Sequence, residues 1–152
     1  MPEETEEIVG SLGRELVSDL APEELPLYPS LLGQFRGAAR GRAGKSSDDQ
    51  VLGFGAAEVL TMMTPVILSF ASGFWQALVA EAAQGSAHAV LEYVRARLPG
   101  RHDAATVPPL TPDQLRLVRT VAEREARRLD ISEGQAGVLA DAMMGLLAVP
   151  QG

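Results

Sequence analysis

The sequence has no cysteine, one lysine and few aromatic residues. Without cysteine, disulfides, thiolate zinc sites and cysteine nucleophiles are excluded. Aromatic residues make up 5% of the chain and hydrophobic residues 46%, so any core must consist mainly of aliphatic side chains and alanine. These residue types favour helices, and runs of the β-branched and aromatic residues that favour strands are missing. The composition therefore predicts an all-α protein.

A secretory signal is also missing. The N-terminus, MPEETEE, has no basic segment and no apolar run behind the methionine. We therefore expect a cytoplasmic protein, with membrane association as the alternative that its apolar centre leaves open. Lys45 is the only lysine, against twelve arginines, and Ala, Gly and Pro are abundant. This bias suggests a bacterial genome rich in GC.

The chain has little positive charge to offer an anionic partner. Its net charge is −7, and an acidic protein is repelled by the phosphates of nucleic acids. Two basic clusters, within 36–45 and 124–128, have acidic residues close by and no interleaved aromatic side chains that would stack on bases. We therefore expect no nucleic-acid partner.

The centre of the chain lacks charge altogether. Residues 59–80 form an uncharged run of 22 residues. The pattern predicts a long apolar central helix over 55–98, with Pro65 either as a kink or as the first residue of one continuous helix over 65–98. Residues 66–79 are apolar on nearly all sides, which is typical of a fully buried helix.

The flanking segments predict amphipathic helices around this centre. Apolar residues recur at helical spacing over 5–20, and a second helix is expected over 29–41. Two capping boxes predict a C-terminal αα-hairpin over 111–148. We expect residues 1–152 to form a single domain, a helical bundle around the apolar helix. The capping boxes pair Thr111 with Gln114 and Ser132 with Gln135.

No motif supports a catalytic, cofactor or metal site. The segment 41–47, GRAGKSS, is similar to a phosphate-binding loop, but Ala39 stands where the motif needs its first glycine, and no buried strand precedes it. His88 and His102 are the only histidines, too few to close a zinc site. We therefore expect no metal, no cofactor and no enzymatic activity of the chain alone.

Two glutamates flank the uncharged run. Glu58 and Glu81 are the carboxylates that we expect to be partly buried. A charge at a helix end or an interface explains both better than catalysis does.

The uncharged run is the candidate contact surface. Ser69, Gly73 and Ala77 are spaced by four, which places small side chains in a groove where another helix can approach closely. The run also reaches the roughly 20 residues needed to cross a hydrocarbon layer. The candidate interface or membrane-contact residues are Ile67, Ser69, Phe70, Gly73, Phe74, Trp75, Ala77 and Leu78.

Three functions follow from this pattern. The first is a non-enzymatic interaction protein whose apolar helix mediates homo-oligomerisation or docking to a protein partner. The alternative is a membrane-acting effector or anchor whose central helix enters lipid, and the second alternative is a small non-catalytic subunit of an enzyme complex. The layout of a hydrophobic helix sheathed by amphipathic ones resembles soluble helical proteins that oligomerise or enter membranes, such as bacterial pore-forming bundles.

Overall fold

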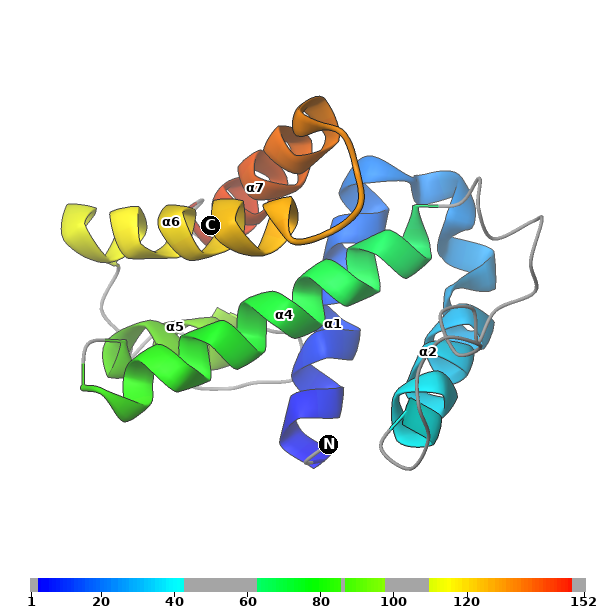
Figure 1. Ribbon diagram of the computed structural model, residues 1–152, viewed down its shortest axis with the longest axis horizontal. Coiled ribbons are helices and arrows are strands. Elements are labelled where there is room, and N and C mark those ends of the chain that lie inside the picture. The colour runs from blue at the N-terminus through cyan, green and yellow to red at the C-terminus, as the bar shows by residue number, and fades with distance from the viewer. Residues whose placement is uncertain (1–2, 43–62, 86, 98–109, 149–152) are drawn as a thin grey trace. The chain divides into compact units, whose positions relative to one another are not determined.

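The computed structural model describes residues 3–42, 63–85, 87–97 and 110–148, and the regular secondary structure in these ranges is helical throughout. The predicted all-α fold is confirmed (Figure 1). The chain divides into two compact units, Met1–Ser69 and Phe70–Gly152, whose boundary falls within the apolar central helix. The elements are α1 (Glu3–Leu20), the 3-10 helix η1 (Pro22–Leu27), α2 (Tyr28–Arg42), α4 (Thr64–Ala83), α5 (His88–Arg97), α6 (Pro112–Arg127) and α7 (Glu133–Ala148).

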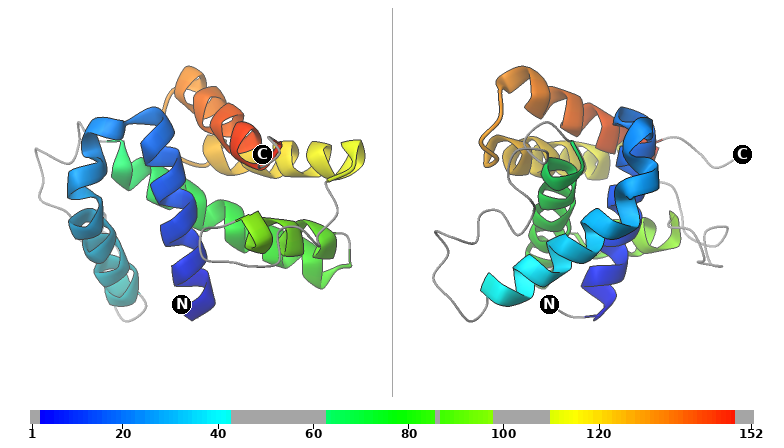
Figure 2. Two further views of the ribbon diagram at one scale, coloured as in Figure 1. Left: turned by 180° about the vertical axis from the view of Figure 1, so that it is seen from behind. Right: turned by 90° about the vertical axis from the view of Figure 1, so that its right-hand side faces the viewer.

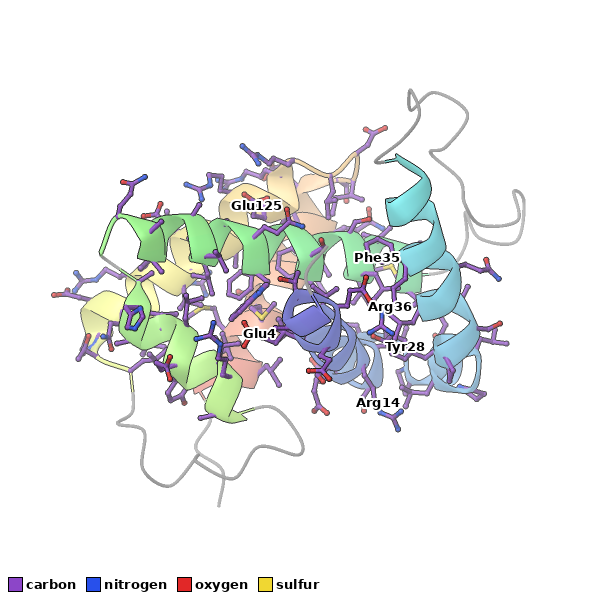
Figure 3. The ribbon with its side chains drawn as sticks, turned by 90° about the horizontal axis from the view of Figure 1, so that it is seen from below. Glu4, Arg14, Tyr28, Phe35, Arg36 and Glu125 are labelled. Atoms are coloured by element: carbon purple, nitrogen blue, oxygen red, sulfur yellow. The ribbon has the colours of Figure 1, made fainter. Side chains whose placement is uncertain are left out.

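In the first unit, α1 and α2 run in opposite directions and η1 joins them (Figure 2). Ile8, Leu12 and Leu16 recur every four residues on α1 and are almost completely buried, as the periodicity predicts. Two hydrogen bonds fasten α2 to the backbone of α1. The Tyr28 hydroxyl donates to the carbonyl oxygen of Gly10, and Arg36 Nη2 donates to the carbonyl oxygen of Glu6 at 2.8 Å (Figure 3).

A glycine makes room for the Tyr28 side chain. A Cβ atom at Gly13 would lie 2.7 Å from Tyr28 Oη and 2.8 Å from Leu68 Cδ2, closer than such atoms approach in proteins. Tyr28 is therefore enclosed between α1 and its own helix. Burial raises the pKa of the Tyr28 hydroxyl above its ordinary value, while the nearby guanidinium groups of Arg36 and Arg14 act in the opposite direction.

The beginning of α4 is capped by a side chain from η1. Both carboxylate oxygens of Glu24 accept hydrogen bonds, from the backbone N–H groups of Met63 at 2.9 Å and Thr64 at 2.8 Å. The Thr64 hydroxyl donates a third bond to Glu24 at 2.6 Å. A carboxylate here satisfies free N–H groups and complements the positive end of the helix dipole. Pro65 stands in the first turn, and the predicted extension over 55–62 lies outside the described residues.

The prediction of one continuous helix over 65–98 is wrong. The structure has α4 and α5 instead, and the chain turns at Gly85, whose φ of +90° lies in the left-handed region. Gly85 N–H donates to the carbonyl of Ala82 at 2.8 Å, which closes the end of α4. Glycine reaches this conformation without a steric penalty, so it ends helices readily. The sequence pattern concealed the break because buried apolar positions continue at Ala87 and Val90 beyond it.

In the second unit, α5 turns back along α4 (Figure 1). Two aromatic side chains organise this region. Trp75 of α4 is 1% exposed, and the guanidinium carbon of Arg95 lies 5.5 Å from its ring centre in a cation–π arrangement. The buried Tyr93 hydroxyl of α5 donates to the carbonyl of Leu147 at 2.7 Å, which ties α5 to α7.

The predicted C-terminal hairpin is confirmed, and α6 and α7 pack closely together. Both predicted capping boxes form. The Gln114 N–H donates to Thr111 Oγ1 at 3.1 Å and the Gln135 N–H donates to Ser132 Oγ at 3.1 Å, with each glutamine side chain accepting a return bond from the capping residue. These local bonds fix where the two helices begin.

Candidate interaction surface on helix α4

Helix α4 divides the eight candidate contact residues between two faces. Five large side chains lie on the buried face, each at most 1% exposed: Ile67, Phe70, Phe74, Trp75 and Leu78. Ser69 is exposed, and Gly73 and Ala77 are partly exposed. Of the eight candidate residues, only these three small ones are therefore not fully enclosed by the folded protein.

The accessible face of α4 is a stripe without charge. Its members, which we term the α4 seam, are spaced alternately by three and four residues, the spacing of positions that meet a second helix in a coiled coil. Four are exposed and two, Val66 and Gly73, are partly exposed. Val79, which is 42% exposed, flanks the seam. The seam consists of Val66, Ser69, Gly73, Gln76, Ala80 and Ala83.

The one polar side chain of appreciable length in the seam is held against its own helix. Gln76 Nε2 donates to Ser72 Oγ at 2.8 Å. This bond satisfies one donor of the Gln76 amide and the hydroxyl of the buried Ser72. A neighbouring helix would therefore meet fewer unsatisfied polar groups.

A carboxylate from α6 lies against the middle of the seam. A Cβ atom at Gly73 would lie 2.8 Å from Glu125 Oε1, so the absence of a side chain at Gly73 permits this approach. Glu125 is 6% exposed, which is unusual for a charged residue. The close helix contact that the small residues predict at Gly73 is therefore formed by α6 of the same chain.

The charge of Glu125 is compensated by one arginine of its own helix and by the residue that caps the end of that helix. Arg124 Nε and Arg128 Nη1 each lie 3.5 Å from Glu125 Oε2, and both arginine side chains are exposed, at 46% and 71%. These contacts are longer than those of Arg119, which forms ion pairs of 3.0 Å with Glu123 and 3.1 Å with Asp141. The hydrogen bond to Glu123, followed by that to Asp141, raises the pKa of Arg119.

Sequence reasoning missed two buried carboxylates. Glu81 is partly buried, as predicted, and Glu58 lies outside the described residues. Glu24 and Glu125 are more deeply buried, at 8% and 6% exposure. No local motif marks either one, because Glu24 bonds to residues about 40 positions away and Glu125 faces a glycine on another helix.

Helix α4 also meets the length and composition of a membrane span. Its most apolar window has a mean hydropathy of 1.4, and 44% of that window is buried inside the protein. The core helix of a soluble protein meets the same two conditions. Lipid is therefore a second possible environment for the same surface.

In the described residues, neither the candidate metal ligands nor the comparisons with known proteins indicate another kind of site. His88 is exposed, and Glu92 pairs with Arg95 at 3.0 Å, while His102 and the 43–47 part of the GRAGKSS segment lie outside the described residues. Within the described ranges no three His, Cys, Asp or Glu side chains converge as a metal site would require. No protein-family model, curated protein or solved structure matches this chain.

Proposed function

We propose that this protein is a non-enzymatic helical interaction protein that self-associates through the α4 seam. The supporting observation is that the seam positions from Ser69 to Ala83, over four helical turns, are uncharged and mostly small, whereas the partly exposed Glu81 lies outside the seam. Charged groups normally cover the exposed side of a surface helix. Small residues let two helix backbones approach closely and gain dispersion contacts along their length.

A second copy of the chain suits this surface better than a charged partner. An ionised side chain placed on the seam would lose water among uncharged residues, and the nearby carboxylate of Glu125 is already compensated by Arg124 and Arg128, so its burial is costly. A two-fold symmetric contact joins the same patch on both subunits. The seam of one copy therefore supplies the uncharged, small-residue surface that the seam of the other copy requires.

An arginine in the seam tests this proposal. Ser69 is exposed, so Ser69→Arg leaves the core of the folded monomer untouched. In the assembled state the long side chain would disrupt the close helix contact, and its charge would lose water. We expect a weakening of self-association by about a hundredfold, since each 1.4 kcal/mol is tenfold in the dissociation constant and burying a charge costs several kcal/mol, which pairing with Glu125 would offset only in part. Sedimentation velocity over a concentration series measures it.

Ser18→Arg is the matched control. Ser18 is exposed on α1, so the same chemical change adds the same charge on a helix that is not part of the seam. The control variant should associate as the wild type does. A wild type that stays monomeric at high concentration, or equal association of both variants with the wild type, would overturn the proposal.

Membrane insertion is the alternative that the length and hydropathy of α4 favour. Insertion would require the buried face of α4, including Ile67 and Phe74, to leave the protein core for lipid. Flotation with liposomes of neutral and anionic lipid tests it. Wild-type protein that floats, with Ile67→Arg remaining in the soluble fraction although it is folded, would favour insertion over self-association in water.

A further inference from the structure

We infer that Gly85 is the hinge through which two copies of this chain can exchange the segment α5–α7, and that its left-handed backbone keeps each copy folded on itself. The φ of +90° at Gly85 lets α5 turn back along α4. In the exchanged dimer, α5–α7 of each copy would pack against α4 of the other copy. The inference goes beyond the proposed function, because the exchange uses contacts inside the protein and not the α4 seam.

The turn at Gly85 is built so that it can open. Ala83, Gln84 and Gly85 are exposed, and nothing lies within 4 Å of a Cβ placed at Gly85. The N–H groups of Gln84 and Gly85 donate to carbonyls three residues earlier, those of Glu81 at 3.0 Å and Ala82 at 2.8 Å. In a right-handed continuation of α4, both N–H groups would donate to carbonyls four residues earlier instead. Opening the turn therefore leaves neither donor without a partner.

The segment beyond the hinge has contacts of its own. The buried Tyr93 hydroxyl donates to the carbonyl of Leu147 at 2.7 Å, which joins α5 to α7. Helices α6 and α7 pack closely together, and each begins in its own capping box. None of these contacts involves α4. We therefore expect α5–α7 to move as one body when the backbone at Gly85 changes.

The contacts between α4 and α5–α7 define the surface that a second copy would supply. Trp75 of α4 is 1% exposed, and the guanidinium carbon of Arg95 lies 5.5 Å from its ring centre. A Cβ atom at Gly73 would lie 3.9 Å from the Cβ of Glu125, so α4 and α6 approach closely. Opening the turn separates these pairs and exposes apolar surface to water, which is unfavourable. The α5–α7 segment of a second copy restores every one of them, because it presents the same residues.

Gly85→Ala should favour the exchanged dimer. A left-handed backbone disfavours an L residue in each closed chain by about tenfold in population, and exchange relieves both chains, so the dissociation constant should fall about a hundredfold. Asparagine tolerates the left-handed region, so Gly85→Asn should stay close to the wild type. Gly137→Ala is the matched control, since it makes the same change at an exposed position inside α7 with open space around it. Sedimentation velocity on the full chain measures the dimer.

A pair of engineered cysteines distinguishes exchange from the association of closed chains. The protein has no cysteine of its own, and the Cβ separation of 3.9 Å between positions 73 and 125 suits a disulfide. In Gly73→Cys/Glu125→Cys, the disulfide forms within one chain in the closed form and between chains in the exchanged dimer. Separated monomer and dimer are oxidised and compared on a denaturing gel without reductant.

A gain of dimer in Gly85→Ala, linked between chains and retained with Ser69→Arg, would support the inference. No gain over Gly137→Ala, or dimers whose disulfides lie within single chains, would overturn it and leave the seam proposal standing. Loss of the added dimer on introducing Ser69→Arg would assign it to the seam and also overturn the exchange. If Gly85→Ala does not fold, the cysteine pair in the chain that keeps Gly85 is refolded from urea over a concentration series. Links between chains that increase with concentration would then support exchange, and links within chains at every concentration would overturn it.

Discussion

Buried polar side chains tie together segments that are far apart in this chain. Glu24 reaches the backbone of Met63 and Thr64, Tyr28 reaches Gly10, and Arg36 reaches Glu6. The bonds of Tyr28 to Gly10 and of Glu24 to Thr64 are buried, and a buried polar group left without a partner costs about 1–3 kcal/mol. In the first unit, single residues thus determine where one helix meets another.

Tyr28 makes the stability of the protein sensitive to alkaline pH. Burial raises the pKa of its hydroxyl, so above about pH 10 the unfolded chain releases this proton while the folded chain retains it. The folded state then binds more protons than the unfolded state, and the free energy of unfolding falls as pH rises. We expect the stability advantage of the wild type over Tyr28→Phe to shrink by about 1 kcal/mol from about pH 10 to about pH 11.

Urea unfolding of both proteins in the same series of buffers measures this difference. Near neutral pH, Tyr28→Phe should be less stable by about 1–2 kcal/mol because the carbonyl of Gly10 loses its buried donor. Subtracting the two curves removes the titration of groups that both proteins share. A stability difference that stays constant across the alkaline range would show that the hydroxyl titrates alike in the folded and unfolded chain.

At the scale of elements, α4 depends on interactions at its two ends as well as on its apolar residues. Glu24 caps the beginning and Gly85 closes the end. The sequence predicted the two capping boxes of the hairpin because each box lies within a segment of four residues. It could not predict the Glu24 cap, whose partners lie about 40 residues away.

The end of α4 depends on a left-handed backbone that an L side chain rarely adopts. Gly85 has a φ of +90°, and nothing lies within 4 Å of a Cβ placed there, so backbone strain is the main cost of a substitution. We expect Gly85→Ala to lower the free energy of unfolding by about 1–2 kcal/mol. Chemical denaturation followed by circular dichroism measures this loss.

In contrast to Gly85→Ala, Gly137→Ala should raise the free energy of unfolding. Gly137 lies inside α7, is exposed and has open space around it, so alanine should stabilise the helix by about 0.5–1 kcal/mol. A Gly85→Ala protein as stable as Gly137→Ala would mean that the turn between α4 and α5 tolerates a right-handed backbone, as in the continuous helix that the sequence first predicted.

At the scale of the whole molecule, two compact units share one helix. The boundary between Ser69 and Phe70 lies inside α4 rather than in a linker. Because helix formation is cooperative along the chain, unfolding one half of α4 should weaken the other. We therefore expect a single thermal transition whose calorimetric and van't Hoff enthalpies agree, as in a two-state protein. Two resolved transitions in scanning calorimetry would instead assign separate stability to each unit and contradict the predicted single domain.

The sequence predicted the all-α fold and an apolar central helix, but not which side of α4 is accessible. Residues 66–79 are apolar on nearly all sides, so the sequence pattern does not show which side of the helix faces the core. Packing decides it: Phe74 and Trp75 are buried, whereas Gln76 and Ala80 are exposed. The seam and its contact with Glu125 became visible only with the neighbouring helices in place.

The burial of Trp75 beneath Arg95 has a practical consequence. It is the only tryptophan in the chain, so all indole fluorescence comes from the inner side of α4. Water reaching that ring would shift its emission to the red, whereas a dry environment would keep it blue. The protein therefore carries an intrinsic optical probe that reports, without any label, whether α4 is enclosed or has been opened to solvent.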